Sequence, residues 1–188
     1  MTTAQALARP LPLALLVLAG MAAALGGALV FEHVFGYIPC QLCLQQREPY
    51  YLGLPFAALA VAGLALGWPE AAWRGFLLVA GACLVATLAL GFYHAGAEWG
   101  FWVGPADCGA GGGALPTSAE GLLSALETTK PPSCTEAAGR FLGLSFAGWN
   151  VVAATVLAVL AFRAATPRRL FERAHAPNLG QTQPDARP

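Results

Sequence analysis

Four long apolar stretches constrain this chain more than any other feature of its sequence. They lie at about residues 11–31, 50–68, 71–94 and 142–162. A helix needs roughly 20 apolar residues to cross a hydrocarbon core about 30 Å thick, and each stretch is long enough. The sequence therefore predicts an all-α, membrane-embedded four-helix bundle over residues 1–165, with two outer loops and a polar, disordered tail over residues 166–188.

The composition agrees with a chain that is surrounded by a lipid bilayer. Hydrophobic residues make up 57% of it and charged residues only 11%, whereas soluble domains carry roughly 25% charged residues. Ten basic residues balance ten acidic ones. The chain therefore lacks the basic patch that a nucleic-acid partner would require.

The distribution of positive charge predicts the orientation. Seven of the ten Lys and Arg residues lie near the amino terminus, near the turn between the second and third stretches, or after the fourth stretch. By the positive-inside rule both termini are cytoplasmic, and in a bacterium the two outer loops then face the periplasm from the inner membrane. The first stretch could instead be a secretory signal, but it is as long as the others and shows no clear cleavage site.

Four of the five cysteines fall in the predicted periplasmic loops, where disulfides persist. Cys40 and Cys43 form a C-x-x-C pair, the spacing of reversible dithiol chemistry. The second helix is expected to start near Tyr50, so its amino terminus and Arg47 predict a lowered pKa for Cys43. A static disulfide and half of a zinc site are the alternatives. Cys83, in the middle of the third stretch, is interpreted as an apolar filler.

Cys108 and Cys134 lie in the second loop and have two interpretations. Glycines at residues 109–113 favour a pair that moves, and the alternative is a structural staple. The four outer cysteines could together bind zinc, but zinc sites usually use two close pairs and this chain has one, so no metal is predicted. A capping box at residues 117–120 predicts a short helix, either on the membrane surface or within the loop.

Two ionisable residues lie where the predicted spans meet the outer surface. Arg47 precedes the second span and His94 ends the third. Ionisable groups at membrane depth often mark function, and both side chains could donate hydrogen bonds to the carbonyl oxygens of a quinone. Both could equally anchor their helices at the lipid surface. Glu32 and His33, at the end of the first span, carry the same two interpretations.

A combination of motifs resembles the disulfide bond formation protein B (DsbB) family. It consists of Phe31–Val34, Pro39–Cys43, Arg47, His94, Cys108, Cys134, Phe141–Leu144 and Trp149. The resemblance covers roughly residues 11–165, and the combination is specific although each motif alone is weak. The glycine-rich loop departs from the family pattern, which leaves the partner of the loop pair open.

The resemblance implies an electron path. A DsbA-like periplasmic thioredoxin-fold oxidase would react with a Cys108–Cys134 disulfide, and Cys108 would form the mixed disulfide. The electrons would then pass to a redox-active Cys40–Cys43 disulfide through a bond between Cys40 and Cys134. Cys43 would reduce a membrane quinone, either ubiquinone or menaquinone.

The resemblance also implies the residues that bind the quinone, namely Arg47 and, near the same headgroup, His94. Two rival functions remain. In enzymes like vitamin K epoxide reductase the C-x-x-C pair follows the loop pair in the chain, and here the order is reversed. A non-enzymatic membrane protein with two static disulfides is the other rival.

Overall fold

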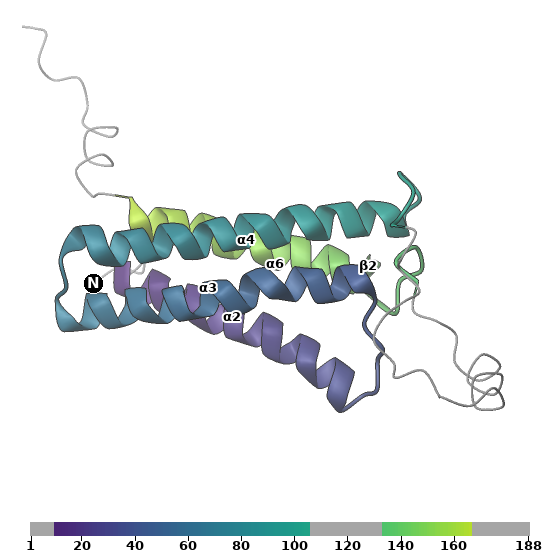
Figure 1. Cartoon of the computed structure of the whole chain (residues 1–188), viewed down its shortest axis with the longest axis horizontal. Coiled ribbons are helices and arrows are strands. Elements are labelled where there is room, and N and C mark those ends of the chain that lie inside the picture. The colour runs from purple at the N-terminus through teal and green to yellow at the C-terminus, as the bar shows by residue number, and fades with distance from the viewer. Residues whose placement is uncertain (1–9, 106–132, 167–188) are drawn as a thin grey trace, which may run out of the picture.

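The computed structural model describes residues 10–105 and 133–166, and within them four helices form an up-and-down bundle (Figure 1). The helices are α2 (Pro10–His33), α3 (Gln41–Leu66), α4 (Glu70–Glu98) and α6 (Phe146–Ala165). Two short strands, β1 (Arg140–Phe141) and β2 (Leu144–Ser145), pair as a hairpin ahead of α6. The prediction of an all-α four-helix bundle is confirmed. Cys108, the glycine-rich segment, the expected loop helix and the tail beyond residue 166 lie outside the described residues.

All four helices are long and apolar enough to cross a membrane. Large apolar side chains such as Leu16, Val85 and Val156 are exposed on the outside of the bundle. Apolar surface of this extent is stable where lipid, rather than water, surrounds the helices. The chain is a multi-pass membrane protein.

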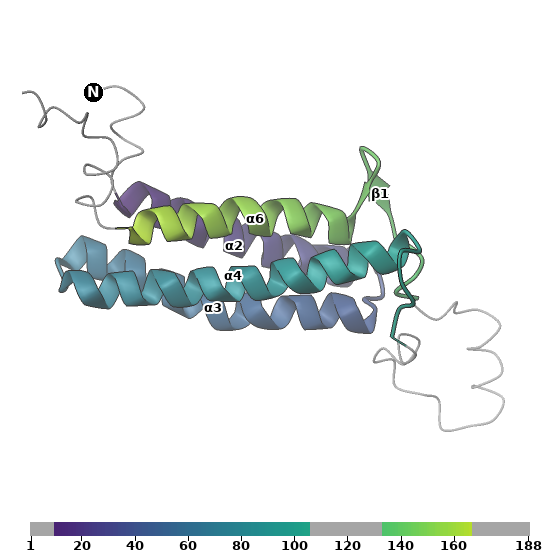
Figure 2. The same ribbon diagram turned by 90° about the horizontal axis from the view of Figure 1, so that it is seen from above.

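Each helix packs against the next in chain order, and α6 closes the ring by packing against α2 (Figure 2). Small residues line these contacts, among them Ala57, Ala80 and Ala161, which are fully buried around Met21. Small side chains let helix backbones approach closely in a membrane, where dispersion forces hold helices together.

Gly53 is a point of close contact in this core. A Cβ at this position would lie 2.6 Å from Cε of Met21 and 3.0 Å from Cβ of Cys83. We expect Gly53→Val to destabilise the protein by roughly 1–3 kcal/mol through overpacking, measured as a lower midpoint of thermal unfolding in detergent. Gly26→Val on α2 is the control, because a Cβ there meets nothing within 4 Å. Equal shifts in both variants would contradict this account of the packing.

α3 begins directly after Cys40, and not near Tyr50 as predicted. Cys40 is the N-cap of the helix, and its Sγ accepts a hydrogen bond from the backbone N–H of Cys43 at 3.3 Å. Pro49 therefore lies inside the helix and not in its first turn. The prediction failed because the apolar pattern starts only after the polar segment Gln45–Glu48, whereas the residue that caps the helix is a cysteine.

α4 continues past His94, where the prediction ended it, to Glu98. Trp102 folds back over this last turn, and its Nε1 donates a hydrogen bond to the carbonyl of Tyr93 at 2.8 Å. The indole also covers Gly96, where a Cβ would overlap the ring. The additional turn places Glu98 inside the protein, one helical turn beyond His94.

α6 begins at Phe146, and not at Leu142 as predicted, because a hairpin turn intervenes. Leu142 has a φ of 52° and Gly143 a φ of 84°, and two successive positive φ values suit a two-residue hairpin turn. Ser145 then caps α6, with its Oγ accepting a hydrogen bond from the backbone N–H of Gly148 at 3.1 Å. The hairpin keeps the segment before α6 folded over the end of the bundle.

Candidate redox site

The C-x-x-C pair forms the beginning of α3. Cys40 is buried at the N-cap and Cys43 lies half-buried in the first turn. Their sulfurs lie 2.9 Å apart and share a hydrogen bond, and both residues are free thiols. The N-cap position places the sulfur of Cys40 at the positive end of the helix dipole, where a negative charge is stabilised.

The thiolate form is favoured at Cys40. Its hydrogen bond with the Cys43 thiol lowers the pKa of Cys40 from 9.0 to about 4 against the opposing effect of burial, and a hydrogen bond with His94 adds to the lowering. The sequence predicted a lowered pKa for Cys43, whereas in the structure it is the thiolate of Cys40 that is stabilised. That prediction was wrong because α3 begins at the pair itself, so that Cys40 occupies the helix N-terminus.

The ultraviolet absorbance of the reduced protein should reveal this thiolate. Because the folded pKa of Cys40 is lowered, its thiolate should form as the pH rises through about 4 and persist at neutral pH, where an ordinary cysteine is protonated. Cys40→Ser should remove this titration and Cys83→Ser should keep it. A wild-type protein whose thiols all titrate near pH 9 would contradict the assignment.

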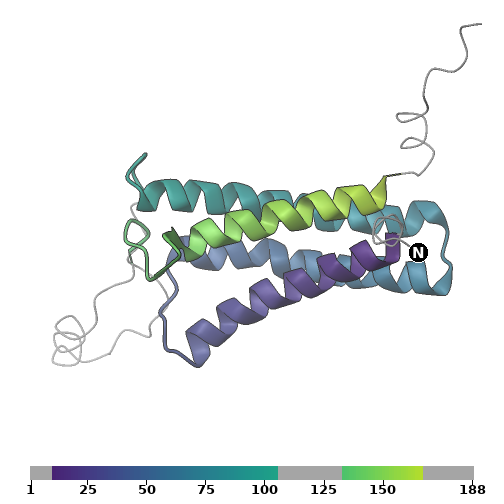
Figure 3. The same ribbon diagram turned by 180° about the vertical axis from the view of Figure 1, so that it is seen from behind.

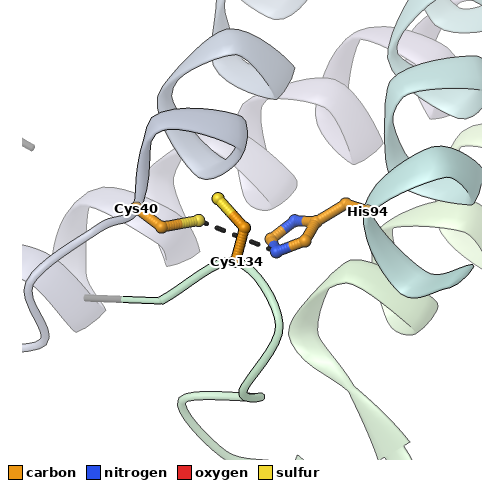
Figure 4. Close-up of side chains that lie close together, drawn as sticks. All are labelled: Cys40, His94 and Cys134. Carbon is orange, nitrogen blue, oxygen red and sulfur yellow. Dashed lines mark hydrogen bonds between the residues drawn. The ribbon is translucent and has the colours of Figure 1, made fainter. Parts of the chain in front are cut away.

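Cys134 approaches Cys40 and His94 from the segment that precedes β1 (Figure 4). The three side chains are buried, and the two sulfurs and a ring nitrogen of His94 all lie within 4.8 Å of one another. Sγ of Cys40 lies 3.6 Å from Nε2 of His94. Cys134 takes part in a disulfide, so the thiolate of Cys40 lies beside a disulfide sulfur, as thiol–disulfide exchange requires. Zinc binds cysteine as a thiolate, but the sulfur of Cys134 is held in a disulfide. This arrangement therefore favours thiol–disulfide exchange over zinc binding.

A buried hydrogen-bond network holds the ring of His94 in place through its Nδ1 atom. The Nε2 of Gln46 donates to this nitrogen at 2.8 Å and to the carbonyl of Leu42 at 3.2 Å. Asn150 of α6 donates to Oε1 of Gln46 at 2.8 Å. Because Gln46 donates to Nδ1, the proton of a neutral His94 lies on Nε2, which faces Cys40.

The sequence interpretation missed the members of this network. Thr87 donates to the carbonyl of Gln46 at 2.8 Å, and the hydroxyl of Tyr50 donates to Oδ1 of Asn150 at the same distance. These residues come from α3, α4 and α6. The available signal was the presence of Thr87 and Asn150 as isolated polar side chains in apolar spans, since polar groups at membrane depth are costly and often functional.

A cavity of about 310 Å³ lies among α2, α3 and α6. Its lining includes the last part of α2, and at this end α2 leans away from its neighbours in two opposite views (Figures 1 and 3). The wall is mainly apolar, and its polar or reactive side chains include Glu32, Cys43, Gln46, Arg47, Tyr50, His94 and Asn150. A mainly apolar cavity with a few converging polar groups is typical of a small-molecule site. Arg47 and His94, the predicted cofactor-binding residues, both lie on its wall.

Arg47 connects α3 to α2 along this wall. It forms an ion pair with Glu32 and donates from Nη2 to the carbonyl of Ala28 at 3.4 Å. The side chain is 12% exposed, so it faces the cavity and does not extend toward lipid headgroups. His33 is exposed and bonds the carbonyl of Leu29, so Glu32 contributes to the cavity and His33 does not.

A second cavity of about 200 Å³ lies on the other side of the cysteine pair. Its lining includes Cys40, Glu98 and the segment that follows Cys134, and it shares Cys43 and His94 with the first cavity. Glu98 approaches Nε2 of His94 to 3.7 Å, and its side chain is only 4% exposed. The additional turn of α4 brings this acid into the site.

Comparison with known proteins assigns the chain to a family. The family model described as "Disulfide bond formation protein DsbB" matches residues 10–164. The chain belongs to the DsbB family. Disulfide bond formation protein B of Aromatoleum aromaticum (strain DSM 19018 / LMG 30748 / EbN1) is 30% identical to it over 149 residues, which are 73% of this chain and 81% of that protein. No solved structure gives a significant match. Membership in the DsbB family identifies the chain as a membrane disulfide oxidoreductase that acts in disulfide bond formation.

Proposed function

We propose that this DsbB-family protein reoxidises a DsbA-like periplasmic thiol oxidase and passes the electrons to a membrane quinone. The observation that carries the proposal is the position of the cysteine pair between two environments. Cys43 lines the 310 Å³ cavity within the bundle, while Cys40 lies beside the disulfide-bonded Cys134 at the end of the bundle. The pair can therefore exchange with the loop on one side and with a membrane-soluble acceptor on the other.

The partner side begins with a Cys108–Cys134 disulfide. A thiolate of the reduced partner attacks Cys108, which forms a mixed disulfide and releases Cys134 with the electron pair. The second partner thiolate resolves this bond, so that the partner leaves oxidised and both loop cysteines are reduced. This step needs no new oxidant, because the loop disulfide is consumed as the partner disulfide forms.

The loop then transfers its electrons inward. The thiolate of Cys134 attacks Cys40 of the Cys40–Cys43 disulfide, which forms a Cys134–Cys40 bond and releases Cys43 with the electron pair. Cys108 attacks Cys134, restores the loop disulfide and releases Cys40. Two observations support this order: Cys134 is disulfide-bonded while Cys40 and Cys43 are free thiols, and Cys40 is the member of the pair that lies next to Cys134.

The residues around the larger cavity fit a quinone. A bound quinone would accept two electrons and two protons there. The apolar wall would contact its ring, and Arg47 would donate hydrogen bonds to a carbonyl oxygen while Glu32 holds the guanidinium in place. His94 reaches the same cavity, and Cys43 on the wall presents the sulfur from which the electrons leave.

The proposed orientation places the cysteine end of the bundle in the periplasm. The start of α2 and the end of α6 lie together at the opposite end (Figures 1 and 2). The excess of arginine in the segments at that end supports a cytoplasmic location. Labelling from the two sides of the membrane would overturn the proposal if it placed Cys40 and Cys43 on the cytoplasmic face.

Thiol titration after incubation with quinone tests the proposal. The purified protein is reduced with a small dithiol, freed of reductant and mixed with excess ubiquinone or menaquinone in detergent. We expect its thiols to disappear as quinol forms. A protein with two static disulfides, or one whose thiols persist with both quinones, would contradict the assignment.

A further inference from the structure

Glu98 is a buried acid that the electron path does not use. One carboxyl oxygen, Oε1, lies 3.7 Å from Nε2 of His94. The other, Oε2, is buried and has no hydrogen-bond partner among the described residues. The side chain lines the second cavity together with Cys40 and Cys43. A buried carboxylate with an unsatisfied oxygen is costly, and uptake of a proton relieves that cost.

Among the described residues, the lining of the second cavity includes no arginine or lysine that would balance a carboxylate. The titratable residues that line it in the described part of the chain are Cys40, Cys43, His94, Glu98 and Glu136. Glu136 comes from the segment before β1 and is exposed. Arg47 lines the other cavity, where it forms an ion pair with Glu32. Within residues 10–105 and 133–166, Glu98 therefore shares this wall with a thiolate, an imidazole and a second acid, and with no arginine or lysine.

His94 can donate one hydrogen bond toward this cavity. Gln46 donates to its Nδ1, so a second proton on the ring would displace that hydrogen bond, and the ring proton lies on Nε2. Nε2 faces both Sγ of Cys40, at 3.6 Å, and Oε1 of Glu98, at 3.7 Å. When Cys40 is a thiolate, two anions compete for one donor, and like charges this close disfavour each other.

The two competitors differ in the other hydrogen bonds that they receive. The sulfur of Cys40 accepts a hydrogen bond from the backbone N–H of Cys43 and lies at a helix N-terminus. Oε2 of Glu98 has no comparable donor among the described residues. The negative charge is therefore better stabilised on Cys40, and a proton is better placed on Glu98.

We propose that Glu98 takes up a proton each time the Cys40–Cys43 disulfide is reduced and releases it each time that disulfide forms. Two electrons from a dithiol break the S–S bond, one proton binds the sulfur of Cys43, and the second binds a carboxyl oxygen of Glu98 while Cys40 stays a thiolate. When the Cys40–Cys43 disulfide forms again, both electrons leave the two sulfurs, and both protons leave Cys43 and Glu98. The buried site then carries one negative charge in either redox state. Glu98 is thus a positioning residue that acts on Cys40 through His94.

Redox-difference infrared spectroscopy of the full chain in detergent tests the proposal, with a small dithiol as the reductant. Reduction of the wild-type protein should produce the carbonyl stretch of a protonated carboxyl group. Glu98→Gln should lose this band. Glu70→Gln should keep it, because Glu70 is an exposed acid that pairs with Arg74 at the far end of the same helix. Absence of the band in the wild type, or its survival in Glu98→Gln, would overturn the proposal.

Proton uptake provides a second measurement. With the same reductant and a pH indicator, Glu98→Gln should bind one proton fewer per disulfide reduced than the wild type at neutral pH, and equal uptake would overturn the proposal. The inference rests on the proposed redox role of Cys40 and Cys43, but neither measurement uses a quinone or a protein partner. A pair that cannot be reversibly reduced would refute the proposed function. A pair that cycles without the carboxyl band would refute only the role of Glu98.

Discussion

Replacing Cys43 by serine is expected to abolish electron transfer to quinone. The loss should be on the order of 10⁴-fold or more, as is typical when the nucleophile of an enzyme is removed. Cys43 is the cysteine that lines the 310 Å³ cavity, whereas Cys40 faces Cys134 and His94. Serine preserves the volume of the side chain but cannot donate an electron pair and then form a disulfide. Quinol formation by the purified protein, with a reduced dithiol as electron donor, measures the effect.

Cys83→Ser is the matched control for this experiment. Cys83 is also a free cysteine within the bundle, but it lies in the middle of α4 and lines neither cavity. Its replacement should leave quinone reduction nearly intact. Similar activities in the two variants would show that Cys43 is not the residue that contacts the acceptor.

Replacing Cys134 by serine should separate the two halves of the reaction. Oxidation of a protein dithiol should fall to the uncatalysed rate, because the loop can no longer pass electrons to Cys40, whose sulfur lies within 4.8 Å of that of Cys134. Oxidation of a small dithiol by quinone should continue, because such a molecule can reduce the Cys40–Cys43 pair directly. Parallel assays with a thioredoxin-fold dithiol protein and with a small dithiol measure the two rates.

The same variant offers a way to identify the partner. Cys108 of this variant is first converted to a mixed disulfide with a small aromatic thiol, and a partner that keeps only its attacking cysteine then displaces the aromatic thiolate, so that a Cys108–partner disulfide should accumulate and be visible on a non-reducing gel. Loss of both dithiol activities in Cys134→Ser would contradict the division of roles. So would an unchanged rate with the protein dithiol.

The two cavities give this division a physical basis. Cys43 and His94 are among the residues that belong to the walls of both, so a cysteine of the pair and an imidazole lie at the boundary between the interior of the bundle and the side that faces the loop. Electrons can pass across this boundary by exchange at the cysteine pair. In the proposed reaction, the partner protein and the lipid-soluble acceptor therefore bind on different sides of the cysteine pair and do not contact each other.

The sequence by itself determined the architecture and supplied a prediction of the reactive residues. Apolar length and arginine placement are properties of single segments, so four spans and an orientation could be predicted without tertiary contacts. The spacing of Cys40 and Cys43 indicated redox chemistry, and the family motifs brought in Arg47 and His94, both of which line the larger cavity. The ends of the helices were less predictable, because a cysteine cap and a Leu142–Gly143 turn leave little trace in an apolar pattern.

Only the tertiary structure decided which groups tune the site. Gln46, His94 and Asn150 form one network from three helices, across 48 and 104 positions of sequence, and no local pattern encodes such a convergence. The start of α3 decided that Cys40 rather than Cys43 receives the helix N-terminus. One additional turn of α4 placed Glu98 against His94. The sequence specifies which chemistry is present, whereas packing decides how each group is charged, because charge depends on burial and on neighbours from other helices.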